Sequence, residues 1–288
     1  MKIKKAILPV AGFGTRFLPA TKAQPKEMLP VVDKPVIQYL VEEAVASGIE
    51  EIIFVTGRGK RAIEDHFDVS FELEKTLVEK DKIDALRDVQ KVAKLAKFSY
   101  VRQPEPLGDG HAILCAKHLV HPGESVAVLF GDDLIDSTVP AIKQLIDVHE
   151  ETSGPVVALC QVDKEDVHRF GVVDPINVDG RTCEIKEFVE KPKTENAPSN
   201  LAAVGKYIIT PEVFKKLEES MNDKGEIRLA NAFVKMLKDN KKMYGHEVKG
   251  NRYDCGDKFG FVQATIQMGL KHPEIKEKLA KYITTLNS

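Results

Sequence analysis

The 288-residue sequence contains no tryptophan, only four cysteines and almost no excess of charge. Its 42 Lys and Arg residues face 44 Asp and Glu residues, a formal net charge of −2. This balance argues against a duplex nucleic-acid binder, because such proteins normally carry a basic surplus or stripe. No apolar run approaches the ~20 residues of a membrane span, and the apolar part of the N-terminus is too short for a signal peptide. We therefore expect neither nucleic acid nor a membrane as a partner.

The few cysteines also limit the possible compartments and cofactors. They lie at positions 115, 160, 183 and 255, and their spacing fits neither a zinc pattern nor a disulfide framework. Cys115 and Cys160 lie in apolar segments and are predicted to be core thiols. A reducing cytoplasm is the expected compartment.

Short apolar segments alternate with amphipathic ones along most of the chain. The pattern predicts a helix over 35–48 and strands over 5–10, 51–56, 97–102, 125–130 and 155–162. Continuous apolar runs are typical of strands that are buried on both faces of a parallel sheet. Helices between such strands indicate βαβ units, so the sequence predicts an α/β fold. The length allows about two domains, but no linker is visible, and we favour one elaborated domain over 1–288.

Three stretches depart from this alternation. The highly charged segment 71–96 predicts an exposed helix that is carried as an insertion. Residues 172–189 predict antiparallel strands, with a turn at 178–180. From Pro211 onward the chain is predicted to be mostly helical, and both the 71–96 segment and the C-terminal helices are candidate surfaces for a partner subunit.

The first predicted strand runs directly into a loop that is rich in glycine, with Gly12 and Gly14 followed by Arg16. Glycines let backbone N–H groups approach a ligand closely and form an anion nest, and a guanidinium group matches phosphate oxygens. Lys26 supplies a second cation. A Walker loop is excluded because no Gly-Lys-Ser/Thr ending follows, and a dinucleotide fingerprint lacks its third glycine, since position 17 is Phe. The prolines at 19, 25 and 30 predict a long ordered loop, which is usually functional.

Later segments place polar residues next to predicted strands. Gln103 offers a donor and an acceptor that suit the edge of a pyrimidine base. Asp132 and Asp133 end a buried strand, where α/β sheets bind ligands, and their hard oxygens suit Mg²⁺. Glu190 can accept from two sugar hydroxyls, and Lys191 can bind a phosphate, although an isolated acid–base pair is more often a solvated surface pair.

The glycine loop, with the Pro, Lys and Leu residues that follow it over 8–30, resembles the signature of the sugar-phosphate nucleotidylyltransferases. The sequence of residues 8–22 is similar to that of their uridylyltransferase branch, whereas thymidylyltransferases usually have Leu in place of Phe17. The later motifs recur in the same order along nearly the whole chain. The resemblance implies a Rossmann-like nucleotidyltransferase fold, with a mixed, mostly parallel central sheet flanked by helices and a small antiparallel sugar-binding subregion. It also implies a nucleotide-binding part of about 1–135 and a sugar-binding and oligomerisation part of about 136–288.

The resemblance further implies Mg²⁺-dependent transfer of UMP from UTP to glucose 1-phosphate, giving UDP-glucose and pyrophosphate. Catalytic roles are implied for Arg16, Lys26 and Lys191, and metal binding for Asp132 and Asp254. Nucleotide contacts are implied for Ala11, Gly12, Gly14, Thr15, Glu27, Gln103 and Gly108, and sugar contacts for Gly171, Glu190, Ala203 and Val204. Asp133 is a candidate substrate contact, with support of Asp132 or capping of the next segment as alternatives. The family often has Leu in place of Asp109, which affects the expected ribose contacts.

The chemistry implied is a direct in-line displacement, in which a phosphate oxygen of the sugar attacks the α-phosphorus of UTP. The phosphate is already an anion near neutral pH, so no general base is required. Positioning and charge stabilisation are then the main tasks of the site. The alternatives are a thymidylyltransferase or an enzyme for another sugar phosphate, a nicotinamide-dependent oxidoreductase, and a non-catalytic nucleotide-sugar sensor. The resemblance also implies a homo-oligomer, either a dimer or a tetramer.

Overall fold

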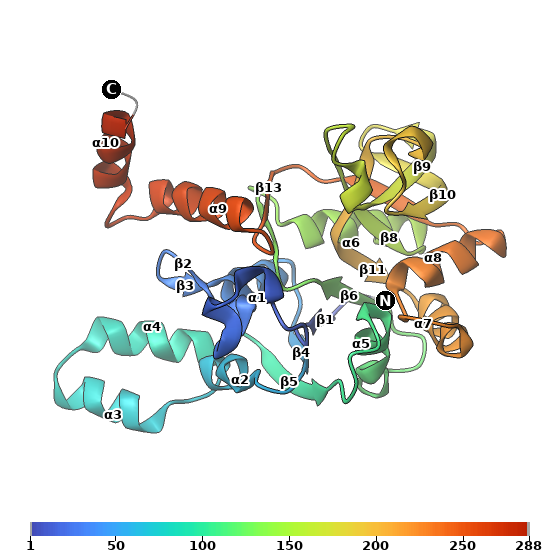
Figure 1. Cartoon of the computed structure of the whole chain (residues 1–288). Helices are drawn as coiled ribbons and strands as arrows, with labels where there is room; N and C mark the ends of the chain where they lie inside the picture. Colours follow the sequence, from blue (N-terminus) through green and yellow to red (C-terminus); the bar gives the residue numbers. More distant parts are fainter. Residues whose placement is uncertain (1, 287–288) are drawn as a thin grey trace.

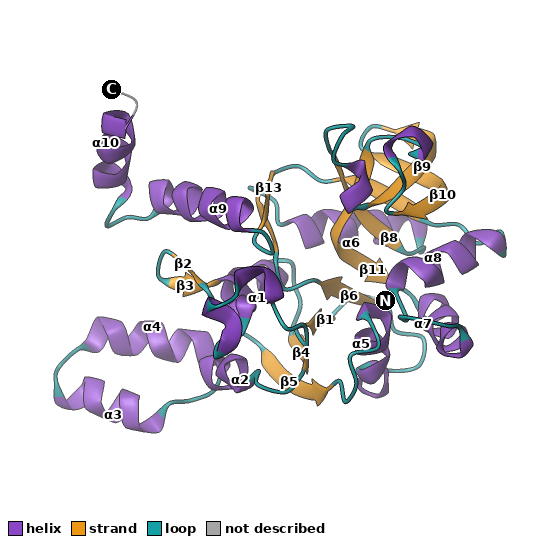
Figure 2. Cartoon of the chain, in the orientation of Figure 1, coloured by secondary structure: helices purple, strands orange, loops and turns teal. Residues whose placement is uncertain are grey.

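The computed structural model describes residues 2–286, and within them a nine-stranded sheet forms the centre of the molecule (Figures 1 and 2). The strand order across the sheet is β5-β4-β1-β6-β11-β8-β12-β10-β9. In that order the strands are β5 (Lys97–Arg102), β4 (Glu51–Thr56), β1 (Lys5–Pro9), β6 (Val126–Leu129), β11 (Leu201–Ile209), β8 (Val156–Gln161), β12 (Tyr244–Glu247), β10 (Thr182–Glu190) and β9 (Gly171–Asp179).

The sheet is mixed, as the resemblance implies, but its two halves differ. Strands β5, β4, β1 and β6 pair in parallel, and β12 pairs in parallel with β8. The pairings of β11 with β6, β8 and β9, and of β10 with β9 and β12, are antiparallel. The parallel character that we expected is therefore concentrated in the N-terminal half. Antiparallel strands need only a tight turn between them, and β9 and β10 are joined at Gly180, which has φ +57°.

Helices cover both faces of the sheet. The core on one face includes side chains of α1 (Val36–Ala46), α2 (Arg61–Phe67) and α6 (Ala141–Thr152). The core on the other face includes side chains of α5 (Asp109–Cys115), α7 (Pro211–Glu219) and α8 (Leu229–Lys238). The sheet strands contribute to both cores, because successive side chains of a strand point to opposite faces. This layered arrangement confirms the predicted α/β class.

The charged segment 71–96 differs from the prediction of one helix. It forms two helices, α3 (Phe71–Glu79) and α4 (Ile83–Ala93), because the chain turns at Asp81, which has φ +52°. Neither helix has a buried residue, and Figure 1 shows the pair extending from the body beside α2.

The C-terminal part is mostly helical, as predicted, and ends in α9 (Lys258–Lys271) and α10 (Lys276–Leu286), which extend away from the sheet in Figure 1. The sequence did not predict β12, nor the small pairing of β7 (Asp133–Asp136) with β13 (Asn251–Asp254). A further short pairing joins β2 (Pro30–Val31) to β3 (Lys34–Pro35). None of the helices within residues 2–286 has the length and hydrophobicity required to cross a membrane.

Candidate active site

Three adjoining cavities lie near the carboxyl ends of β1 and β6. We call them cavity A, about 340 Å³, cavity B, about 570 Å³, and cavity C, about 160 Å³. Phe130, which follows β6, lines all three, and the side chains of Asp132 and Asp133 line two each. Ligands of α/β proteins bind outside the carboxyl ends of strands, so this position agrees with the fold.

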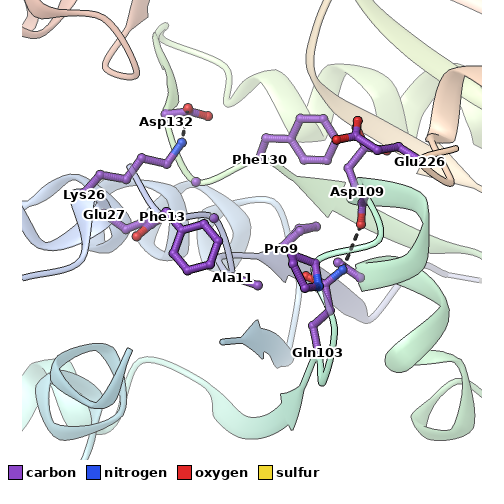
Figure 3. A pocket seen from close by; sticks show the side chains of 15 residues that line it. Pro9, Ala11, Phe13, Lys26, Glu27, Gln103, Asp109, Phe130, Asp132 and Glu226 are labelled. Atoms are coloured by element: carbon purple, nitrogen blue, oxygen red, sulfur yellow. Dashed lines mark hydrogen bonds and ion pairs between the residues drawn. The ribbon is translucent and has the colours of Figure 1, made fainter. Parts of the chain in front are cut away.

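Cavity A is formed by the glycine loop, the end of β5 and the start of α5 (Figure 3). Gly14 adopts φ +65°, and a Cβ there would lie 2.9 Å from Lys26 Cβ, so the loop packs closely on the segment that carries Lys26. A Cβ on Gly12 would meet nothing within 4 Å. The predicted nucleotide contacts that line cavity A are Ala11, Gly12, Glu27, Gln103 and Gly108, and Lys26, for which a catalytic role is predicted, lines it as well. Gly14 and Thr15 lie in the same loop but do not line any of the three cavities.

Gln103 lies at one end of cavity A. Its amide Nε2 donates to Gly108 O at 2.9 Å and lies 3.1 Å from His111 Nδ1. Because both contacts engage the NH₂ group, they fix the amide plane and leave the carbonyl oxygen oriented as an acceptor. His111, for which the sequence left the role open, therefore helps to hold Gln103.

Asp109, where the family often has Leu, lines cavity A and also contacts the start of α8. Its Oδ1 accepts from Leu229 N at 2.7 Å, at the start of α8, and burial raises the pKa of this carboxyl group. Gly110 N donates to Ile227 O at 2.8 Å, and a Cβ on Gly108 would lie 2.4 Å from the same oxygen. These contacts bring residues 226–229 against cavity A, whose lining includes Glu226. No local motif in the sequence predicts this approach.

Asp132 and Asp254 come together around Gly256. A Cβ on Gly256 would lie 2.4 Å from Asp132 Oδ2 and 3.0 Å from Asp254 Oδ1. Lys26 Nζ donates to Asp132 Oδ2 at 2.5 Å. Burial would raise the pKa of Asp132, but the charges of Lys26 and Arg16 outweigh burial and hold the pKa below its ordinary value. Burial and the neighbouring carboxylates raise the pKa of Asp254.

This pair fits a magnesium site that is completed by substrate. Hard carboxylate oxygens are the protein ligands of Mg²⁺, which usually takes one or two of them together with phosphate oxygens and waters. Within the described part of the chain, no cluster of three or more His, Cys, Asp or Glu side chains is arranged to hold a metal ion. Asp132 and Asp254 thus fit a metal site in which substrate phosphates supply the other ligands better than a site in which the protein supplies all of them.

Asp133 has two protein partners. Its Oδ2 accepts from Gly205 N at 2.8 Å, and its Oδ1 accepts from Arg252 Nε. The guanidinium of Arg252 also lies 5.1 Å from the ring centroid of Phe170. These contacts tie β7 to β11 and β13, so they favour the interpretation that Asp133 supports the site, although its side chain lines cavities B and C.

Cavity C lies on the antiparallel half of the sheet. Glu190 on β10 is paired in register with Gly171 on β9, and both residues line the cavity with Ala203 on β11. A Cβ on Gly171 would lie 2.5 Å from Phe188 Cζ and 3.1 Å from Glu190 Oε2, so the absence of a side chain keeps this space open. Val204 belongs to the core on the opposite face, because it alternates with Ala203 along β11. Its side chain therefore does not reach cavity C, and Gly205 lines the cavity instead.

The remaining predicted cations line cavity B. Arg16 is exposed and donates to Gly256 O at 3.4 Å. Lys191 is also exposed, has φ +49°, and donates from its backbone N to Phe170 O at 2.9 Å. Cavity B thus has a cationic wall next to Asp132 and Asp254.

Three cations that the sequence analysis did not assign also contact the predicted site residues. Arg169 Nη2 lies 3.1 Å from Asp257 Oδ2 and 3.8 Å from Asp254 Oδ2. Arg252 pairs with Asp133, and Lys60 Nζ donates to Glu27 Oε2 at 2.7 Å. Lys60 follows the predicted strand 51–56, and this position at the carboxyl end of a strand was the one feature of the sequence that could have marked it as a candidate site residue.

Residues 5–269 match the family described as Nucleotidyl transferase, and the chain belongs to this family. It is therefore an enzyme of the nucleotidyltransferase class, as the loop signature indicated. Over 287 residues, 99% of both chains, it is 53% identical to the UTP–glucose-1-phosphate uridylyltransferase of Staphylococcus epidermidis. A similar solved structure is that of a UTP-bound UGPase from Acinetobacter baumannii, with 39% identity, a TM-score of 0.90, and coverage of 98% of this chain and 99% of that one. Another is a UDP-glucose pyrophosphorylase complexed with UDP-glucose, with 41% identity, a TM-score of 0.84, and coverage of 94% of this chain and 100% of that one.

Proposed function

We propose that this enzyme transfers UMP from UTP to glucose 1-phosphate, giving UDP-glucose and pyrophosphate by direct in-line displacement. The observation that carries the proposal is the row of cavities A, B and C, which share Phe130 and meet at Asp132 and Asp133. The names of the similar chains, and the UTP and UDP-glucose in two of the similar structures, support this choice of substrates.

The side chains divide the binding tasks. Gln103 and the glycine loop would hold the uridine in cavity A, and Glu190 would accept hydroxyl groups of the sugar in cavity C. Arg16 and Lys26 would hold the triphosphate, while Lys191 would hold the sugar phosphate at cavity B. Their fixed charges offset the repulsion between two polyanions and stabilise the charge that develops on the leaving group.

Asp132 and Asp254 would hold Mg²⁺. When bound, the ion would supply Lewis-acid polarisation and charge neutralisation at the phosphate oxygens. The side chain of Lys26 would remain between the carboxylate of Asp132 and the phosphates, where its three donors suit several oxygens.

The test incubates the purified protein with UTP, glucose 1-phosphate and Mg²⁺, and measures pyrophosphate and UDP-glucose. We expect stoichiometric formation of both products, loss of activity with EDTA, and weaker activity with dTTP or with epimers of the sugar phosphate. A chiral α-thio UTP should react with inversion at phosphorus. Pyrophosphate release that does not depend on glucose 1-phosphate would contradict the proposed transfer to this sugar. A preference for dTTP would favour a thymidylyltransferase instead.

We further propose that the enzyme is a cytoplasmic homo-oligomer, a dimer or a tetramer. Cys115, Cys160, Cys183 and Cys255 are all unbridged, which agrees with a reducing compartment. We also propose that residues of about 1–135 mainly bind nucleotide and those of about 136–288 mainly bind sugar and partner subunits. Light scattering coupled to size-exclusion chromatography measures the oligomeric state.

A further inference from the structure

A buried ion pair that the proposed reaction does not use lies behind the wall of cavity A. Lys60 Nζ contacts Glu27 Oε2 at 2.7 Å, and the two side chains are 6% and 1% exposed. Glu27 lines cavity A, whereas Lys60 does not. The lysine therefore reaches the cavity only through the carboxylate that it contacts.

The pair connects the turn that carries Lys26 and Glu27 with the loop that follows β4. Lys26 and Glu27 are neighbours in the short helical turn η3 (Lys26–Met28), and their side chains pair with Asp132 and Lys60, respectively. Lys60 comes from the loop after β4, where a Cβ on Gly57 would lie 2.9 Å from Ala11 O. The turn is thus held from two sides, at the ends of β6 and β4.

The position of Glu27 limits what its carboxylate can bind. Gln103 lies at one end of cavity A and Asp132 with Lys26 at the other, and Glu27 adjoins Lys26 (Figure 3). An ionised carboxylate only accepts hydrogen bonds and repels phosphate. Its partners in the cavity must therefore be donors on the nucleoside, and a carboxylate that rotates or takes up a proton would bind them less well.

We propose that Lys60 is a positioning residue for nucleotide binding, which holds the Glu27 side chain in place and directed toward the nucleoside in cavity A. The inference rests on the proposed function, because it takes UTP as the ligand of that cavity. A purely structural role is a weaker account, since a buried ion pair contributes little net stability compared with well-packed apolar groups. Burying the pair costs desolvation of both groups, and the benefit of the contact lies in an acceptor that is held in a fixed orientation.

The test is a double-mutant cycle of the wild type, Lys60→Met, Glu27→Gln and the double variant. Each protein is assayed for kcat, for KM of UTP and of glucose 1-phosphate, and for the Kd of UTP by calorimetry. We expect Lys60→Met to raise KM and Kd for UTP by ~10-fold or more, the loss typical of a weakened hydrogen bond to a charged group. We expect kcat and KM for glucose 1-phosphate to stay within ~3-fold of wild type, the limit that we set for an unchanged constant.

The cycle separates positioning from general stabilisation. Once Glu27→Gln is present, Lys60 has no carboxylate to hold, so Lys60→Met should then change KM for UTP by less than ~2-fold, a near-complete coupling of the two sites. If Lys60→Met alone does not fold, KM for UTP can still be compared between Glu27→Gln and the double variant, and a large difference between them would contradict the positioning role.

A matched control is available at the opposite end of β1. Lys5 is a buried lysine that lies 3.2 Å from Glu124 Oε2 and donates to Leu119 O at 2.7 Å. Lys5→Met should lower the melting temperature without changing KM for UTP. The proposal is overturned if Lys60→Met leaves KM for UTP unchanged, if the effects of Lys60→Met are equal in both backgrounds, or if kcat falls while KM stays constant. Failure of the wild type to bind UTP would instead overturn the proposed function.

Discussion

Replacing Gly256 by alanine tests whether Asp132 and Asp254 act as one carboxylate pair. The new Cβ would lie 2.4 Å from Asp132 Oδ2 and 3.0 Å from Asp254 Oδ1. The backbone of Gly256 is outside the left-handed region, so alanine does not strain the main chain. The substitution therefore acts on the two carboxylates and leaves the local backbone as it is.

The distances set the size of the expected effect. Ordinary contacts of a Cβ begin at 3.4 Å, so Asp132 Oδ2 must retreat by about 1 Å. The same oxygen accepts from Lys26 Nζ at 2.5 Å, so the lysine must move as well. A misplacement of ~1 Å at a reacting centre can reduce the rate by ~10²-fold, which corresponds to ~2.7 kcal/mol.

The assay measures UDP-glucose formation as the Mg²⁺ concentration is varied. We expect Gly256→Ala to lower kcat by ~10²-fold and to raise the Mg²⁺ concentration for half-maximal activity. Gly245→Ala is a matched control, because its Cβ would lie 2.4 Å from Leu159 Cδ1 in the core. This control should lower the melting temperature and leave the response to Mg²⁺ unchanged.

A folded Gly256→Ala enzyme with wild-type kcat and the wild-type Mg²⁺ requirement would refute the reasoning. It would show that the spacing of Asp132 and Asp254 is not important to the reaction. An equal loss of activity in Gly245→Ala would refute it in another way, because the effect would then follow from stability alone.

Three further predictions follow from the same geometry. Arg16→Ala should lower kcat by at least ~10²-fold with the fold intact, since the side chain is exposed and would supply charge to the phosphates under the proposed function. Gly171→Ala should raise KM for glucose 1-phosphate by ~10-fold or more and leave KM for UTP unchanged, because its Cβ would lie 2.5 Å from Phe188 Cζ and 3.1 Å from Glu190 Oε2, and would crowd both side chains in cavity C. Asp257→Ala should lower the free energy of unfolding by ~1 kcal/mol at pH 7, because Asp257 caps α9. Hydrogen bonds from Gly260 N and Phe259 N hold the pKa of Asp257 below its ordinary 3.8, so this contribution is complete above that value and disappears as the pH falls through the lower, folded-state pKa.

Each of these predictions has a result that would contradict it. Near-normal turnover in Arg16→Ala would remove the triphosphate role of this residue. An unchanged KM for glucose 1-phosphate in Gly171→Ala would place the sugar outside cavity C. For Asp257→Ala, denaturation curves at several pH values that show a constant difference from wild type down to strongly acidic pH would exclude the capping account.

Much of the site was accessible from the sequence because its chemistry is local. The glycine loop with Arg16 follows a strand, and Asp132 follows another, so strand patterning and residue type suffice to put them at one edge of the sheet. The hairpin that carries Gly171 and Glu190 is also encoded locally, by alternation and by a turn at Gly180.

The tertiary structure decided what depends on register and long-range contact. Ala203 reaches cavity C and Val204 does not, because one residue of shift along a strand changes the face of the sheet. The pairing of Lys60 with Glu27, and the approach of Glu226 to cavity A, join positions far apart in the chain. The sequence by itself thus determined the family, the α/β class and most of the candidate site residues, since these follow from short motifs and periodicity. Only the packed fold determined which charges hold those groups in place, because burial and partner choice arise when distant segments meet.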